Sequence, residues 1–279
     1  MRASGKRCSP RFGPAGIPVG CKGGTLAGVK YVREEGLNAF EVEFVRGVKL
    51  SEEKAREVGR VASQLDVELS AHAPYWINCC SKERKKIEIS IRNLVQSLKV
   101  SNAMQAKCVV FHPGYYMGMS SGEAFKLCVR TLEEVLERIG KVKTKLSPET
   151  TGKPTQFGSL EEVIALCREM DMMPTIDFAH LHARNNGMIK GKEDYLKIFD
   201  KIERELGRRV VKTLHIHFSE IEFNEKGEKR HLNLFTTNSP PVKEMLKVIK
   251  EQGYSPTIIC ETPLLDKDAL KMKEMFEKI

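Results

Sequence analysis

The stretch Pro174-Thr175-Ile176-Asp177-Phe178-Ala179-His180 decides how the rest of the chain is interpreted. A short apolar run ends on a carboxylate, and an imidazole follows three residues later. Other strand-like runs also end on a side chain able to bind a metal, at residues 69–72, 109–112, 146–149, 214–217 and 258–261. In an αβ barrel such positions converge on one rim, where active sites are built.

Strand-like and helix-like segments alternate along the whole chain, and no low-complexity tract divides it. The pattern predicts a (β/α)8 TIM barrel that forms a single domain over residues 1–279, because such barrels typically contain about 250 residues. An open doubly wound sheet is the alternative, but no Gly-x-Gly-x-x-Gly turn supports it. We expect a seventh strand at residues 210–217, and polar loops at residues 178–191 and 219–239.

The composition describes a charged chain without a membrane segment. Hydrophobic residues make up 41% of the sequence, and no run approaches the ~20 apolar residues that a membrane span requires. We therefore expect a soluble, cytoplasmic protein, and we expect it to be a monomer. The formal net charge is +9, which favours anionic partners such as nucleic acid. Helices rich in lysine and glutamate, as in heat-stable proteins, would explain the same charge.

Imidazole and carboxylate side chains are preferred zinc ligands. The candidate ligands lie at or after strand ends, and they are His72, His112, Glu149, Asp177, His180, His215, His231 and Glu261. A single histidine at a strand end is more often a hydrogen-bonded structural residue, so the prediction depends on the whole set. We interpret His182 and His217 as supporting or structural residues, because a neighbouring histidine already fills the ligand role.

Several of these segments together resemble the signature segments of the endonuclease IV family. They are His72-Ala73-Pro74-Tyr75, His112-Pro113-Gly114, Glu149-Thr150, Asp177-Phe178-Ala179-His180 and Cys260-Glu261-Thr262. The resemblance implies a TIM barrel with a trinuclear zinc site. By resemblance, His72, His112 and Glu149 hold the first metal. Glu149 bridges to a second metal that Asp177, His215 and Glu261 also hold, and His180 and His231 hold a third.

The sequence departs from the family pattern at three places. Lys229 stands where the family has an aspartate two residues before His231, and Glu228 replaces that aspartate only through a one-residue shift. The family pattern His-x-Asn-Asp is not met at His215. The DNA-contacting loop after strand two is shorter, and Arg46 is the nearby residue of matching kind.

The resemblance implies hydrolysis of double-stranded DNA on the 5′ side of an abasic site, leaving a 3′-hydroxyl and a 5′-deoxyribose phosphate. Two or three zinc ions would serve the reaction, with Glu261 and Glu149 as catalytic residues and Glu261 orienting the water. We expect Tyr75, Trp76 and Arg46 to contact DNA, the aromatic rings by stacking on bases or filling the gap of a missing base.

Two alternatives remain open on the sequence alone. A sugar isomerase or epimerase of the xylose-isomerase-like group would share the barrel, but it needs about four ligands and has no use for His180 and His231. A protein that binds damaged DNA without cutting it would explain Lys229. The number of bound metal ions and a nicking assay separate these three interpretations.

Overall fold

The chain folds into a closed barrel of parallel strands. The computed structural model describes residues 9–279, so the first eight residues of the expected 1–279 domain lie outside the described part. Within the described residues the barrel strands are β1 (Arg11–Pro14), β2 (Ala39–Glu43), β3 (Glu68–His72), β4 (Cys108–Phe111), β6 (Lys145–Pro148), β8 (Thr175–Asp177), β9 (His215–Phe218) and β12 (Thr257–Cys260). They pair in the orders β1-β12-β9-β8 and β2-β3-β4-β6. Isolated parallel bridges, Ala15 with Glu41 and Glu149 with Thr175, join the two groups. The predicted TIM-barrel fold is confirmed.

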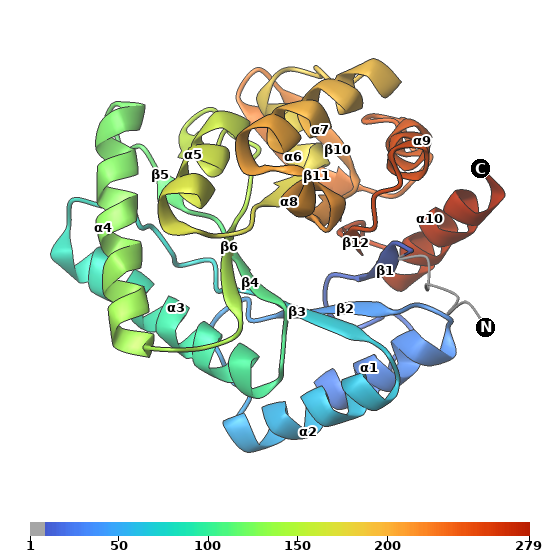
Figure 1. The fold of residues 1–279 in the computed structure, drawn as a ribbon, viewed down its shortest axis with the longest axis horizontal. Helices are drawn as coiled ribbons and strands as arrows, with labels where there is room; N and C mark the ends of the chain where they lie inside the picture. Colours follow the sequence, from blue (N-terminus) through green and yellow to red (C-terminus); the bar gives the residue numbers. More distant parts are fainter. Residues whose placement is uncertain (1–8) are drawn as a thin grey trace, which may run out of the picture.

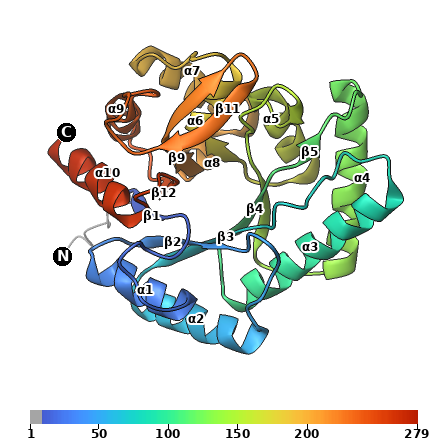
Figure 2. The ribbon, with the colours of Figure 1, turned by 180° about the vertical axis from the view of Figure 1, so that it is seen from behind.

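Helices surround the barrel, as Figures 1 and 2 show from opposite sides. They are α1 (Thr25–Glu34), α2 (Glu52–Gln64), α3 (Arg84–Ala103), α4 (Ser121–Ile139), α5 (Leu160–Met170), α6 (Phe178–Arg184), α7 (Lys192–Leu206), α8 (Arg208–Lys212), α9 (Val242–Gln252) and α10 (Asp266–Lys278). Reciprocal capping boxes begin α4 and α5, where Ser120 pairs with Glu123 and Ser159 pairs with Glu162. These caps satisfy amide groups that the first helical turn leaves without partners.

Two antiparallel pairs of short strands extend the loops at the carboxyl ends of the barrel strands. β5 (Gly114–Tyr115) pairs with β7 (Gln156–Phe157), and β10 (Glu220–Asn224) forms a hairpin with β11 (Gly227–Leu232). We expected a polar loop over residues 219–239, and this hairpin corrects that expectation. The apolar side chains Ile221 and Phe223 alternate with polar residues and pack near Ala179 and Ala183 of α6.

Two further local expectations were wrong. Residues 178–184 form α6 instead of a loop, because the Asp177 carboxylate accepts the His180 backbone N–H and caps the first turn. The seventh strand begins at His215, and residues 208–212 form one turn of helix after Gly207. The β-branched side chain of Val211 favoured a strand in the sequence. In the structure this turn of helix buries the same side chain in the core.

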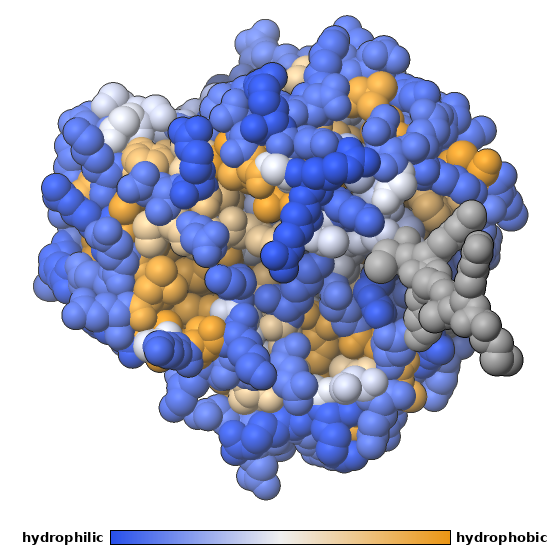
Figure 3. Space-filling view, in the orientation of Figure 1, coloured by the Kyte–Doolittle hydropathy of each residue, from blue (hydrophilic) through white to orange (hydrophobic). Residues whose placement is uncertain are grey.

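Apolar side chains fill the space between the barrel and the helices, in two buried clusters. Figure 3 shows hydrophilic side chains over most of one face of the molecule, with smaller apolar areas between them. Among the described residues, the helices include none with the length and hydrophobicity that crossing a bilayer would require.

Candidate metal centre

Glu149 lies at the centre of a group of histidines at the carboxyl ends of the strands. It follows β6 and is fully buried. Its Oε2 atom lies 3.1 Å from His72 Nε2 and 3.0 Å from His112 Nε2. Its Oε1 atom lies 3.1 Å from His180 Nδ1 and 3.4 Å from His217 Nδ1. The two carboxylate oxygens thus face two different pairs of imidazoles, which is the arrangement of a bridging carboxylate.

Asp177 and His180 come from the end of β8 and the first turn of α6. The Asp177 carboxylate is fully buried, and its Oδ2 atom lies 3.5 Å from His180 Nδ1. That Nδ1 atom also lies 3.0 Å from the Thr150 carbonyl oxygen, to which it donates in the corresponding tautomer. His180 Nε2 then points at Glu228, whose Oε2 atom is 3.0 Å away. The spacing Asp-x-x-His therefore places both side chains in the cluster.

A β-bulge brings Glu228 into the cluster in place of the family aspartate. The β10–β11 pairing shifts register between Glu222, which pairs with Arg230, and Phe223, which pairs with Glu228. Lys229 is the extra residue, and its ammonium lies 2.8 Å from Glu222 Oε1 on the exposed side. A bulge of this kind reverses the normal alternation of a strand. Glu228 therefore faces the same side as His231 although it lies three positions before it in the sequence.

Glu261, His217 and His231 complete the cluster. Glu261 follows β12, and its Oε1 atom lies 3.0 Å from His217 Nδ1. Its Oε2 atom lies 3.9 Å from His231 Nε2. The other nitrogen of His231, Nδ1, lies 2.6 Å from Ser219 Oγ. Glu261 and His231 are partly exposed, so they lie on the solvent side of the group.

His217, which we expected to be a supporting residue, is the β9 histidine that contacts Glu149 and Glu261, whereas His215 groups with Glu41 and His217. Both face the barrel interior, because they are two residues apart on β9. His215 Nε2 lies 2.8 Å from Glu41 Oε2, deeper in the barrel, whereas His217 contacts Glu149 and Glu261. Residue spacing gave the direction of these side chains but not their depth.

The pattern His-x-Asn-Asp becomes recognisable once it is read from His217. The sequence His217-Phe218-Ser219-Glu220 then has a small polar residue and an acid in the matching places. Glu220 is fully buried. Its carboxylate accepts backbone N–H groups of Phe235, Thr237 and Asn238, at 2.5, 2.6 and 2.9 Å. It therefore fixes the loop that follows the hairpin.

Burial and mutual attraction shift the pKa values in the cluster in opposite directions. Burial raises the pKa of Glu149, but the His112 and His217 imidazoles outweigh burial and hold it well below its usual range. Burial raises the pKa of Asp177 well above its usual range. Burial lowers the pKa of His72, yet Glu43 and Glu149 outweigh it and raise that pKa to about 10. The carboxylates thus demand positive charge, which protons or bound cations supply.

The donor set fits divalent cations. Several buried polar atoms in the cluster make no hydrogen bond, namely Glu149 Oε1, Asp177 Oδ2, both ring nitrogens of His217 and Glu228 Oε2. Such atoms are costly unless a cation or proton satisfies them. The donors also divide into groups whose ligand atoms lie within 4.8 Å of one another, and these are His72 with His112 and Glu149, Glu149 with Asp177, His180 and Glu261, His180 with His231 and Glu261, and, deeper in the barrel, Glu41 with His215 and His217. Nitrogen and oxygen donors of this kind suit zinc.

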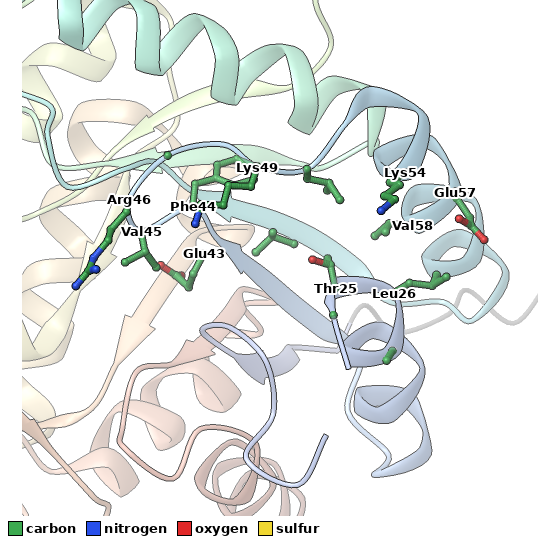
Figure 4. A pocket seen from close by; sticks show the side chains of 15 residues that line it. Thr25, Leu26, Glu43, Phe44, Val45, Arg46, Lys49, Lys54, Glu57 and Val58 are labelled. Atoms are coloured by element: carbon green, nitrogen blue, oxygen red, sulfur yellow. The ribbon is translucent and has the colours of Figure 1, made fainter. Parts of the chain in front are cut away.

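The predicted DNA-contacting residues lie on loops beside this cluster. Tyr75 and Trp76 follow β3, and each is 68% exposed. Burial together with the Glu43 and Glu261 carboxylates raises the pKa of Tyr75. Arg46 lies on the loop after β2 and is exposed. It lines one end of a cavity of about 790 Å³ between α1, α2 and this loop, with Lys54 at the other end (Figure 4).

Sequence reasoning missed Glu41 and Glu43, whereas it interpreted His182 as a supporting or structural residue. Glu41 and Glu43 alternate on β2 and point into the barrel, and this acidic alternation in a buried strand was the available signal. Burial raises the pKa of Glu43 to about 8. His182 lies outside the cluster, where its Nε2 is 2.6 Å from Ser239 Oγ and its Nδ1 accepts the Ile189 N–H. It is a structural residue of the α6 region.

Comparison with known proteins adds an independent line of support. Residues 29–279 match the model of the xylose isomerase-like TIM barrel family. The chain is 37% identical over 270 residues to an uncharacterized protein of Methanocaldococcus jannaschii, covering 96% of this chain and 97% of that protein. It is 30% identical over 203 residues to a probable endonuclease 4 of Mycoplasma genitalium, covering 70% of this chain and 67% of that protein.

The fold also matches solved structures. Endonuclease IV from Thermus thermophilus superposes with a TM-score of 0.74 at 20% identity, over 97% of this chain and 100% of that one. At this identity the likeness shows the fold alone, so what the centre does has to be argued from its own side chains.

Proposed function

Because the chain belongs to the endonuclease IV family of xylose isomerase-like TIM barrels, we propose that it is a DNA repair endonuclease that cuts the phosphodiester 5′ to an abasic site. The observation that carries the proposal is the placement of Glu149 between two pairs of imidazoles, one pair at each carboxylate oxygen. A single cation does not require such a residue, whereas neighbouring cations need a bridging carboxylate to offset their mutual repulsion.

The donor groups assign ligands to two or three zinc ions. His72 and His112 would hold one ion with Glu149, and Asp177, His217 and Glu261 would hold a second. Glu228 would join His180 and His231 around a third. When bound, clustered zinc ions polarise phosphoryl oxygens and make a water nucleophilic near neutral pH. We keep His215 out of this set, because its contact is with Glu41.

The protein's own residues would bind and orient the substrate. Glu261 is 16% exposed in its side chain and lies on the solvent side of the cluster, where its carboxylate would orient the attacking water. Tyr75 and Trp76 would stack on bases beside the missing one, and Arg46 would contact a phosphate. The leaving group is the 3′-oxygen of the preceding nucleotide, so the products are a 3′-hydroxyl and a 5′-deoxyribose phosphate.

A nicking assay with a duplex that contains one abasic site tests the proposal. Zinc-loaded protein should cut at that site and leave an end that a DNA polymerase extends, and a chelator should abolish cutting. Glu261→Gln should lose cutting and keep duplex binding, whereas Glu222→Gln on the exposed hairpin should retain both. Cutting by Glu261→Gln at the wild-type rate would contradict the role of Glu261.

The same assay separates the alternatives. Duplex binding without nicking, unchanged in His112→Ala, would identify a binding protein that does not cut. One tightly bound divalent ion and no nicking would instead favour a sugar isomerase or epimerase.

A further inference from the structure

A layer of charged and polar side chains lies inside the barrel beneath the metal cluster. Glu41, Ser70 and His215 are at most 2% exposed. Ser70 Oγ donates to Glu41 Oε2 over 2.6 Å, and His215 Nε2 lies 2.8 Å from the same oxygen. TIM barrels usually fill this layer with branched apolar residues. Because burying a carboxylate is costly unless it is paired, this layer calls for a functional explanation.

His217 connects this layer to the metal cluster. It is fully buried. Its Nε2 atom lies 2.9 Å from Glu41 Oε1, and its Nδ1 atom faces Glu261 and Glu149 on the opposite side of the ring. Nε2 therefore faces Glu41 in the layer beneath, and Nδ1 faces the carboxylates of the metal cluster.

We propose that Glu41 is a positioning residue that orients the His217 ring, with Nε2 facing Glu41 and the Nδ1 lone pair facing Glu149 and Glu261, where a cation would bind. The inference rests on the proposed function, because it concerns one of the proposed ions. Ser70 and His215 hold the Glu41 carboxylate in place through contacts with its other oxygen, Oε2. A histidine that binds metal commonly donates its second N–H to a carboxylate, which sets its tautomer and makes it a stronger ligand.

The other cluster histidines are oriented differently. His72 Nδ1 lies 2.9 Å from the Ala73 carbonyl oxygen, and His180 Nδ1 lies 3.0 Å from that of Thr150. His231 Nδ1 lies 2.6 Å from the Ser219 hydroxyl. His72 and His231 offer Nε2 to the cluster and rest on neutral groups, whereas His180 Nδ1 also lies 3.1 Å from Glu149 Oε1. His217 offers Nδ1 and rests on the Glu41 carboxylate, so we expect it to carry the tautomer opposite to that of His72 and His231.

The first experiment is a zinc titration of metal-stripped protein against a chromophoric chelator. Glu41→Gln keeps the side-chain volume and one acceptor but removes the charge. The substitution should weaken the binding of one zinc ion about 10- to 100-fold and change the affinity for the other ions by less than about threefold. After cobalt substitution, the visible spectrum of the ion at that site should also change. The matched control is Glu162→Gln, which alters another buried carboxylate that caps α5, and its zinc affinities should equal wild type.

The second experiment uses the wild-type protein, so it decides the matter even if Glu41→Gln does not fold. Long-range ¹H–¹⁵N NMR of histidine-labelled, zinc-loaded protein should show His217 protonated at Nε2 and metal-bound at Nδ1, with its signals assigned by their loss in His217→Gln. A His217 bound through Nε2, or a folded Glu41→Gln with unchanged affinities, would overturn the inference alone. Wild-type protein that binds no zinc at micromolar concentration would overturn the proposed function as well.

Discussion

Replacing Glu228 tests whether the β-bulge supplies the ligand that Lys229 does not. Glu228 Oε2 lies 3.0 Å from His180 Nε2 and makes no hydrogen bond. Burial raises the pKa of Glu228, but His180 outweighs it and the pKa falls to about 2. The carboxylate is therefore ionised at every pH at which the protein would be assayed, and Glu228→Gln removes one full negative charge from the third proposed ion.

The size of the effect follows from that charge. Two unit charges about 4 Å apart interact by about 4 kcal/mol at an effective dielectric constant near 20. Water and the neighbouring Glu261 recover part of this, so we expect a net loss of about 2–3 kcal/mol, or about 30- to 150-fold weaker binding of that ion. The other ions should keep their affinity, because Glu149 and its histidines are untouched.

Metal analysis after dialysis at a fixed free zinc concentration measures the result, and the neighbouring position supplies the control. Lys229→Gln should keep the full metal content, because this side chain points away from the cluster to Glu222. The double variant Glu228→Gln with Lys229→Asp should remain deficient. If the new aspartate restored the third ion, position 229 would face the cluster, and the bulge would not have the role that we assign to it.

Three further predictions concern the surroundings of the centre. Gly152→Ala should mimic Glu228→Gln in metal content, because a Cβ atom at this position would overlap the Glu228 carboxylate. Tyr75→Ala should weaken binding of abasic duplex by about 1–3 kcal/mol in a titration that follows fluorescence anisotropy, with unchanged zinc content, since stacking on a base contributes about that much; equal affinity would mean that the exposed ring only packs its loop. Arg184→Ala should lower the free energy of unfolding in urea by about 2–4 kcal/mol, because its guanidinium donates to Thr151 Oγ1 and to the Lys153 and Gln156 carbonyl oxygens; Arg168→Ala, an exposed control, should change it by less than about 0.5 kcal/mol.

The sequence was sufficient for the architecture because strand ends and helix caps are local signals. His72, His112, Glu149, Asp177 and Glu261 lie at or after the ends of different parallel strands, and a closed barrel brings those ends together whatever the loops do. The fold class and the convergence of these five side chains therefore followed from spacing alone.

What the sequence did not reveal depends on depth and register. His215 and His217 share one face of β9, and nothing in the local sequence says which of them reaches the cluster. That depends on where β9 sits against β8 and β12. The bulge at Lys229 is likewise a property of the paired strands, although Gly227, with φ of +94°, marks the turn that precedes it. Glu41 was missed because its partner His215 is 174 residues away.

The charge distribution concerns two parts of the proposed activity, the long-range attraction of DNA and the binding of a phosphate at the centre. The chain carries a net charge of +9, which attracts a polyanion at long range. The centre itself is acidic, since Glu149, Glu228 and Glu261 all have pKa values below their usual range. The neighbouring imidazoles offset part of this negative charge, and bound cations would supply the positive charge that holds a phosphate. Metal removal should therefore impair specific capture of the abasic site while leaving salt-dependent, non-specific DNA binding intact.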